Sequence, residues 1–381
     1  MTLTTPRILI MAGGTGGHVF PALTIARELM ATGTQVEWLG TRQGLEARVI
    51  GDTDIPLHFI SISGLRGKNL LTRLLSPAVI LIAVVQAVLT IRRIKPSCVL
   101  GMGGFVTGPG GVAARLMGKK LLIHEQNAVA GLTNQLLFPL AHAVMEAFPG
   151  AFVRKQHLGS SHLLKRLLDL RKIVITGNPV RSDILALAPP ASRFAAHTGK
   201  LRLLVVGGSL GAATLNSVVP QMLASMNEAE RPLVRHQCGN RNFEQTAKEY
   251  RTAGLANGTE LELLPFIDDM AEAYAWADVI ICRAGASTIA ELAVIGLPAI
   301  LVPYLHAVDD HQRENARVLE QTGAARVILQ NELDADRLKQ CLYELAPDRA
   351  HLLQHAQAAM KVAIRDASGR AASLCLEACR G

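Results

Sequence analysis

A glycine-rich loop near the start of the chain constrains the fold more than any other feature. Gly13-Gly14-Thr15-Gly16-Gly17-His18 follows a short apolar run at residues 8–12 and precedes a helix-like pattern at residues 20–23. Glycines let the backbone turn sharply and approach a ligand closely, and the N–H groups of a following helix attract anions. This order predicts a strand, a phosphate-binding loop and a helix.

The loop does not fit dinucleotide binding. A GxGxxG frame that starts at Gly14 reaches Val19 where the last glycine belongs. The next β-like run, residues 36–39, ends in Gly40-Thr41 instead of the acidic residue that would hold a ribose. NAD binding is therefore not expected.

His18 is the unusual member of the loop. A loop that only held phosphate would gain little from a side chain that titrates near neutrality, whereas a loop beside a reacting hydroxyl would gain a proton acceptor. We interpret His18 as the general base. The alternative is a histidine that only caps or packs at a helix N-terminus, where the positive potential keeps it neutral in either role.

The strand and loop pattern occurs twice, at an offset of 207 − 13 = 194 residues. Four loops follow β-like runs, at residues 13–18, 101–109, 207–212 and 283–288. The alternation of short apolar runs with helical patterns predicts an α/β protein of two Rossmann-like, doubly wound domains that face a central cleft. Turn chemistry near Gly177-Asn178-Pro179 places the boundary between residues 1–178 and 179–381, with a last helix that returns to the first domain.

Composition indicates a globular chain with two cores, because 49% of the residues are apolar and 18% are charged. The six cysteines show no metal-ligand or disulfide spacing, and Cys375 and Cys379 lie four apart in a helix-like tail. We expect reduced thiols in the cytosol. The first residues show no cationic leader, so export is not expected.

The net charge of +8 is unevenly distributed, and no acidic residue lies between Asp54 and Glu125. This basic stretch includes the uncharged run 74–91, which counts 91 − 74 + 1 = 18 residues. Basic residues around an apolar segment favour an anionic membrane surface as a partner. Nucleic acid is not expected, because aromatic residues for base stacking make up only 4% of the chain.

We expect the apolar run to be a crossover helix of which one edge enters the membrane interface, and not a membrane span. Pro77, Gln86 and Thr90 weaken a span, and a span would separate the strand at 97–100 from the strand at 8–12. Residues 156–172 are a second basic amphipathic candidate, either a packed surface helix or a membrane contact.

Six motifs in this order resemble the MurG-type glycosyltransferases over almost the whole chain. They are Gly13 to His18, Ser63 to Gly67, Gly101 to Phe105, His124 to Asn127, Gly177 to Arg181, and the tract from Phe266 to Gln312. The resemblance implies the GT-B fold. It also implies an inverting, β-1,4-forming transfer of N-acetylglucosamine from UDP-N-acetylglucosamine to lipid I, the undecaprenyl-pyrophosphoryl-muramyl pentapeptide, which makes lipid II for peptidoglycan.

The resemblance further implies a peripheral enzyme at the cytoplasmic face of the bacterial inner membrane. Its first domain would approach lipid I and its second domain would hold the donor. The implied donor-binding residues are Thr15, Gly16, Gly17 and Asn127 near the sugar or diphosphate, Arg181 and Ser209 at the diphosphate, Ile267 at uracil, Ala286, Ser287, Thr288, Ile289, Ala290 and Glu291 at the nucleoside, and Gln312 at the sugar hydroxyls.

Glu125 is a second candidate for the base, and the sequence does not rank it against His18. No cofactor and no metal are expected, because no Asp-x-Asp pair lies in a donor loop. Three alternative functions stay open: a glycolipid synthase with diacylglycerol as acceptor, a UDP-N-acetylglucosamine epimerase, and a noncatalytic subunit that binds nucleotide sugars.

Overall fold

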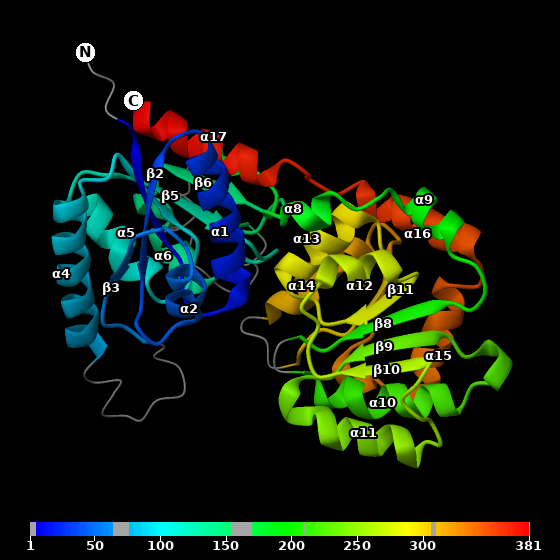
Figure 1. Ribbon diagram of the computed structural model, residues 1–381. Helices are drawn as coiled ribbons and strands as arrows, with labels where there is room; N and C mark the ends of the chain where they lie inside the picture. Colours follow the sequence, from blue (N-terminus) through cyan, green and yellow to red (C-terminus); the bar gives the residue numbers. More distant parts are fainter. Residues whose placement is uncertain (1–4, 64–75, 154–169, 209–210, 306–309, 381) are drawn as a thin grey trace. The chain divides into compact units, whose positions relative to one another are not determined.

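The chain divides into two compact units in a computed structural model that describes residues 5–63, 76–153, 170–208, 211–305 and 310–380 (Figure 1). Unit 1 comprises Met1–Val180 together with Ile364–Gly381, and unit 2 comprises Arg181–Ala363. Each unit is a parallel sheet covered by helices, so the prediction of two doubly wound α/β domains is confirmed. Most of the 156–172 candidate and of the Ser63 to Gly67 motif lies outside the described residues.

Unit 1 contains a seven-stranded parallel sheet of order β3-β2-β1-β4-β5-β6-β7. Its strands are β1 (Arg7–Met11), β2 (Gln35–Gly40), β3 (Leu57–Phe59), β4 (Cys98–Gly101), β5 (Lys120–Glu125), β6 (Ala143–Glu146) and β7 (Ile173–Ile175). The strand order reverses beside β1, where Ile8 pairs with Val36 of β2 on one side and with Cys98 of β4 on the other. Ligands bind at such a reversal, outside the carboxyl ends of the strands.

The helices of unit 1 cover both faces of this sheet. They are α1 (Gly16–Ala31), α2 (Leu45–Gly51), α4 (Ser76–Ile94), α5 (Thr107–Leu116), α6 (Leu132–Leu137) and α17 (Ala367–Arg380). Alternate side chains of a strand point to opposite faces. Ile8 and Ile10 therefore join the core under α1 and α17, whereas Leu9 and Met11 join the core under α4 and α5.

The apolar run forms the crossover helix α4, which begins at Ser76 and ends at Ile94, three residues later than predicted. Ala83, Ala87 and Ile91 are fully buried in the core of unit 1. Of the described helices, α4 is the one whose length and mean hydropathy of 1.8 would suit a membrane crossing, with 22% of its apolar window buried. The strands that a membrane span would separate, β1 and β4, pair with each other in one sheet.

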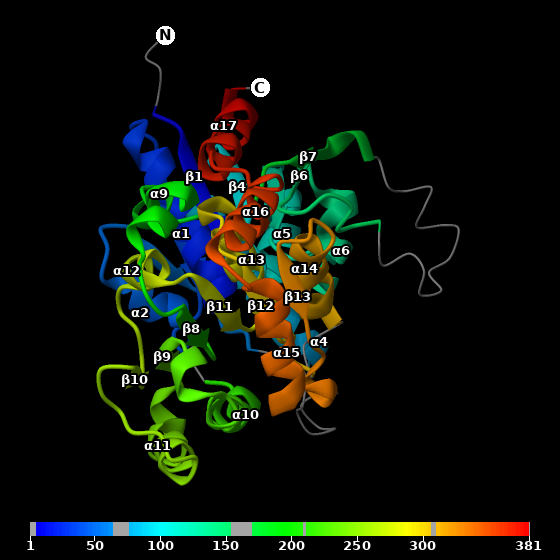
Figure 2. The ribbon, with the colours of Figure 1, turned by 90° about the vertical axis from the view of Figure 1, so that its right-hand side faces the viewer.

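The C-terminal helix α17 belongs to unit 1 although it follows unit 2 in the sequence. It lies beside α1 in both views (Figure 1, Figure 2). Ala371, Ala372, Cys375 and Ala378 form its buried face. These small side chains allow the helix to pack closely on α1 and the sheet.

Unit 2 contains a six-stranded parallel sheet of order β10-β9-β8-β11-β12-β13. Its strands are β8 (Arg202–Val206), β9 (Leu233–Gln237), β10 (Leu261–Leu264), β11 (Val279–Cys282), β12 (Ala299–Leu301) and β13 (Ala325–Val327). Its helices are α8 (Ser182–Leu185), α9 (Pro190–Ala196), α10 (Ala213–Ala224), α11 (Phe243–Thr252), α12 (Met270–Trp276), α13 (Ala286–Ile295), α14 (His311–Glu320), α15 (Ala335–Leu345) and α16 (Arg349–Met360).

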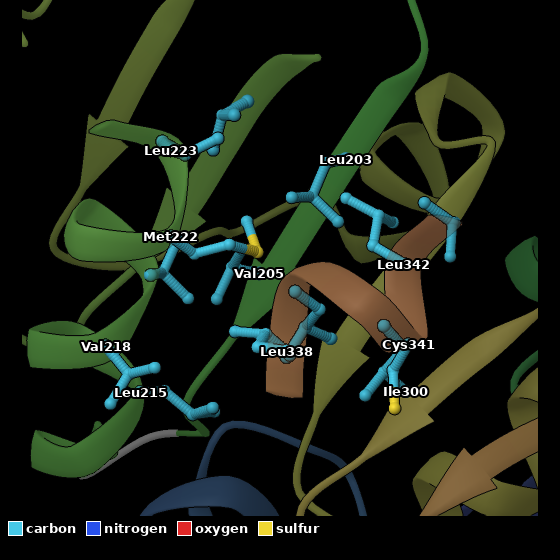
Figure 3. Close-up of a cluster of buried hydrophobic side chains, with 14 of the residues drawn as sticks. Leu203, Val205, Leu215, Val218, Met222, Leu223, Ile300, Leu338, Cys341 and Leu342 are labelled. Atoms are coloured by element: carbon cyan, nitrogen blue, oxygen red, sulfur yellow. The ribbon is translucent and has the colours of Figure 1, made fainter. Parts of the chain in front are cut away.

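The core of unit 2 lies between its sheet and the helices α10 and α15. Figure 3 shows Leu203 and Val205 of β8 with Met222 of α10 and with Leu338 and Leu342 of α15. Each fully buried aliphatic side chain stabilises the fold by about 1.5–3 kcal/mol. The core holds β8 in place, and the second glycine loop follows this strand directly.

Two histidines lie fully buried in the units. His236 of β9 contacts the Tyr250 hydroxyl at 2.8 Å and Asn216 Oδ1 at 3.1 Å, and burial lowers its pKa to about 3. In unit 1, burial lowers the pKa of His124 to about 4, although a hydrogen bond with the Gly177 carbonyl opposes this shift. Both side chains are therefore neutral when the protein is folded near pH 7.

We expect the free energy of unfolding to decrease as the pH falls below about 6.5, because the unfolded chain binds a proton on His236 and the folded unit does not. The contribution of His236 to this loss continues toward pH 3 and amounts to about 2 kcal/mol between pH 7 and pH 5. Urea unfolding of unit 2 at several pH values measures it. His236→Gln removes this titration and lowers the proton uptake on unfolding by about one, whereas equal pH dependence in both proteins would contradict the assignment.

Candidate functional site

The glycine loop of unit 1 lies at the carboxyl end of β1 and passes directly into α1. The sequence pattern placed the helix start near Phe20, but α1 begins at Gly16 with Thr15 as its extended N-cap residue. That prediction is wrong by one turn, because the two glycines adopt the helical conformation themselves. His18 therefore lies in the first turn of α1, half-buried, with its Nδ1 atom 3.1 Å from Thr15 Oγ1.

The loop after β4 supports the His18 ring. A Cβ atom on Gly103 would lie 2.6 Å from His18 Cδ2, and Gly103 has a φ of +96°. A Cβ atom on Gly104 would lie 2.2 Å from the Gly13 carbonyl oxygen. Thr107 Oγ1 donates to the Met11 and Gly103 carbonyls and so joins the two loops. Glycines at these two positions allow the loop after β4 to pack closely against the first loop and the histidine ring.

A buried carboxylate lies beneath the first loop, and sequence reasoning missed it. Glu46 of α2 accepts hydrogen bonds from Gly14 N at 3.1 Å and from the N and Oγ1 atoms of Thr41, both at 2.8 Å. The Gly14 N–H is thus committed to a protein carboxylate. The N–H groups of Gly16 and Gly17 belong to the first turn of α1, where a helix offers no acceptor of its own. No local pattern around Glu46 signals this role.

Glu125, the second candidate base, is buried at the end of β5 and holds the loop that follows. Its Oε1 atom accepts from Asn127 N at 3.0 Å and from Asn127 Nδ2 at 3.1 Å. Its Oε2 atom accepts from Gly131 N at 3.0 Å and from Asn134 Nδ2 at 2.9 Å. Four donors match the lone-pair capacity of a carboxylate. The same contacts fix Asn127, a predicted donor-binding residue.

The glycine loop of unit 2 follows β8 and leads into a helix, as the loop of unit 1 does after β1. Gly208 and Gly211 have φ values of +84° and +74°, and Gly211 N donates to the Gly208 carbonyl at 2.8 Å. A Cβ atom on Gly211 would lie 2.1 Å from the Cys238 carbonyl oxygen. The loop leads into α10 at Ala213, so its helix N-terminus is oriented as an anion site requires. Ser209, the predicted diphosphate ligand, lies outside the described residues.

Glu291 lies in the middle of α13 and is the centre of a polar cluster. The Tyr274 hydroxyl donates to its Oε2 atom at 2.8 Å. Burial raises the pKa of Glu291, while the Tyr274 hydrogen bond and the positive charge of Arg181 lower it. Arg181 itself lies 3.9 Å from Asp183. The structure thus places the predicted residues Arg181 and Glu291 near each other. It also adds Tyr274 to the cluster, a residue that the sequence alone would assign to the apolar face of a helix.

The other predicted positions of unit 2 differ in what their side chains offer. Ala286, Ile289 and Ala290 are buried in the core, so only their backbones are available to a ligand. Thr288 is half-buried, as is Ile267 between β10 and α12. Ser287 Oγ is buried with no hydrogen-bond partner among the described residues. Gln312 of α14 accepts from Tyr304 N at 2.9 Å, which fixes the orientation of its amide.

The chain matches known proteins along nearly its full length. Residues 8–146 match the glycosyltransferase family 28 N-terminal domain, and residues 202–370 match the C-terminal domain of the same family. The UDP-N-acetylglucosamine--N-acetylmuramyl-(pentapeptide) pyrophosphoryl-undecaprenol N-acetylglucosamine transferase of Marinobacter nauticus is 52% identical over 98% of both chains. The enzyme of that name from Alkalilimnicola ehrlichii is 50% identical over 99% of this chain and 100% of its own.

Solved structures also resemble this chain along nearly its full length. The crystal structure of Acinetobacter baumannii MurG matches with a TM-score of 0.79 and 39% identity over 98% of this chain and 99% of its own. A putative UDP-N-acetylglucosamine 2-epimerase from Listeria monocytogenes matches with a TM-score of 0.66 at 15% identity, over 97% of this chain and 95% of its own. At that identity the likeness extends to the fold alone.

We expect Glu125→Gln to lower the free energy of unfolding by about 1–3 kcal/mol, because the amide nitrogen would face an N–H donor in a buried site. Glu28→Gln on the exposed surface of α1 removes the same charge without burying a donor, and we expect a change within about 0.5 kcal/mol. Urea unfolding of the two variants tests this. An unchanged stability for Glu125→Gln would contradict the loop-holding role.

Proposed function

The chain belongs to the MurG-type enzymes of glycosyltransferase family 28, and from this premise we propose how it acts and which residues do the chemistry. It transfers N-acetylglucosamine from UDP-N-acetylglucosamine to the muramyl sugar of lipid I and so forms lipid II for peptidoglycan. The near-complete match to relatives that carry this activity in their names is the observation that supports the proposal most strongly.

His18 is the proposed general base. The acceptor hydroxyl must lose a proton as it attacks the sugar carbon of the donor, and a neutral imidazole accepts it through one ring nitrogen. In the tautomer in which Nδ1–H donates to Thr15 Oγ1, the lone pair lies on Nε2. Gly103 lies against one side of the ring and restricts its movement on that side. A restricted ring supports catalysis because small displacements of a reacting group are costly.

Glu125 is the weaker candidate for the base, because its two oxygens accept hydrogen bonds from Asn127, Gly131 and Asn134. Proton transfer to this carboxylate would weaken the contacts that hold its own loop. We therefore propose that Glu125 positions the loop that carries Asn127 and that His18 takes the proton.

Unit 2 is proposed to hold the donor. The uridine diphosphate leaves with growing negative charge, which the N-terminus of α10 and the guanidinium of Arg181 stabilise. Glu291 accepts hydrogen bonds from the ribose hydroxyls, while the Tyr274 hydroxyl donates to the same carboxylate and orients it. Ile267 meets the uracil through its backbone, and Gln312 binds sugar hydroxyls. Transfer without a metal ion is part of the proposal.

Membrane association is proposed for one face of unit 1. The helices α4 and α5 pack together, and α5 packs on α6. Their large exposed apolar side chains are Ile80, Leu81, Ile82, Val85 and Leu89 of α4, Val112 and Leu116 of α5, and Leu132 and Leu136 of α6. Exposed Arg92, Arg93 and Arg115 lie on the same two helices, α4 and α5. An apolar face with basic neighbours suits the anionic cytoplasmic leaflet, where the lipid-linked acceptor resides.

We expect the enzyme to transfer labelled N-acetylglucosamine to a short-chain lipid I analogue in the presence of a chelator, and His18→Ala to lose about 10²–10⁴-fold in kcat with donor affinity retained. Gly103→Ala should lose activity as well, because its Cβ would collide with the His18 ring. Gly118→Ala is the matched control, since Gly118 has a φ of +67° and no atom within 4 Å of the added carbon.

Three results would contradict the proposed function. Transfer to diacylglycerol in place of the lipid I analogue would indicate a glycolipid synthase. Turnover of the donor without any acceptor would indicate an epimerase. Donor binding without turnover of any kind, unaffected by His18→Ala, would indicate a noncatalytic subunit.

We expect Leu81→Gln with Leu89→Gln to lower binding to vesicles that contain anionic lipid by about tenfold or more, because two exposed leucines no longer enter the interface. Transfer to the soluble short-chain analogue should stay unchanged. Met30→Gln on α1, another exposed apolar residue of unit 1, is the control and should bind vesicles normally. Equal vesicle binding by all three proteins would rule out this face as the membrane contact.

A further inference from the structure

Two cysteines of unit 1 meet where the C-terminal helix packs on the sheet. Cys98 begins β4, and Cys379 lies near the end of α17, 281 residues later in the chain. Their Sγ atoms are 3.2 Å apart. Cys98 Sγ also lies 3.5 Å from the Cys375 carbonyl oxygen. The Cys98 sulfur therefore contacts two residues of α17 that lie one helical turn apart.

We propose that Cys98 and Cys379 form an oxidisable pair, which a peroxide converts into a disulfide that links α17 covalently to the sheet. This inference is independent of the sugar-transfer function. It rests on a contact at the amino end of β4, whereas the loop that supports His18 follows the carboxyl end of the same strand.

The two thiols differ in the way that such a reaction requires. Cys379 is half-exposed and is open to a small oxidant, whereas Cys98 is fully buried behind it. The contact with Cys98 lowers the pKa of the Cys379 thiol, and the positive charge of Lys120 and a contact with Ser97 lower it further. The same contact, together with burial, raises the pKa of Cys98. The outer sulfur is therefore the better nucleophile, and the inner sulfur is the resolving thiol.

The reaction balances with hydrogen peroxide as the oxidant. The Cys379 thiolate attacks one peroxide oxygen, the O–O bond breaks, and the other oxygen leaves as hydroxide and becomes water. Cys379 is then a sulfenic acid. The Cys98 sulfur attacks this sulfur, the S–O bond breaks, and the departing hydroxide takes the Cys98 proton to form a second water. Two thiols have lost two electrons, and one peroxide has become two waters.

Oxidation would hold α17 in place through a covalent bond. In the reduced protein the helix is held by the packing of small side chains, Ala371, Ala372 and Ala378 among them. A disulfide between residues 281 positions apart would restrict the unfolded chain over most of its length. We expect it to raise the midpoint of thermal unfolding by about 5 °C or more.

Treatment of the full-length enzyme with hydrogen peroxide tests the proposal, with intact mass and peptide mapping as readouts. The expected product is about 2 Da lighter and contains a peptide that joins residues 98 and 379, which a dithiol reductant separates. Cys379→Ser should abolish this product. Cys98→Ala should leave Cys379 as a sulfenic or sulfinic acid, because the resolving thiol is missing.

Cys375→Ser is the matched control, because Cys375 lies one turn away on the same helix and its loss should leave the cross-link intact. Oxidation of Cys379 to a sulfinic acid in the unaltered protein, a link between Cys375 and Cys379, or a dimer joined through Cys379 would each overturn the proposal. Recovery of all six thiols after treatment would overturn it too.

Discussion

The close approach of two glycine loops at the carboxyl ends of β1 and β4 is the contact on which the site of unit 1 depends. Gly104 lies against the Gly13 carbonyl, and Gly103 lies against the His18 ring, at separations that leave no room for a side chain. The buried carboxylate of Glu46 holds the first loop from below. The parallel sheet makes this possible, since β1 and β4 are neighbours and end at the same edge.

Unit 2 repeats this architecture with a different polar content. Its first loop again turns through glycines with positive φ and opens a helix, α10. Its second loop precedes α13, which carries Glu291. The hydrogen bond from Tyr274 and the positive charge of Arg181 both lower the pKa of the Glu291 carboxyl, against the effect of burial. An imidazole in one unit and a half-buried carboxylate near a cation in the other suit the two halves of a sugar transfer, proton removal from an acceptor and binding of a nucleoside diphosphate.

Much of the fold was predictable, because strands buried on both faces read as apolar runs and glycine loops mark their ends. The runs at 8–12 and 279–282 match β1 and β11 within a residue. The start of α1 was misplaced by one turn, since glycines are poor helix formers in isolation and only the surrounding loops make them helical. Glu46 and Tyr274 were missed, because each acts on a partner distant in sequence.

The sequence by itself determined the parallel α/β architecture, the family and the candidate set that includes His18 and Glu291, because glycine spacing and apolar periodicity are local properties of the chain. Only the tertiary structure decided which groups those side chains contact and how far they are buried. Glu125 and His18 look equivalent as candidate bases, yet Glu125 accepts four hydrogen bonds in a buried loop and His18 lies half-buried against a glycine. Hydrogen-bond partners and burial arise from segments brought together by the sheet, so no reading along the chain supplies them.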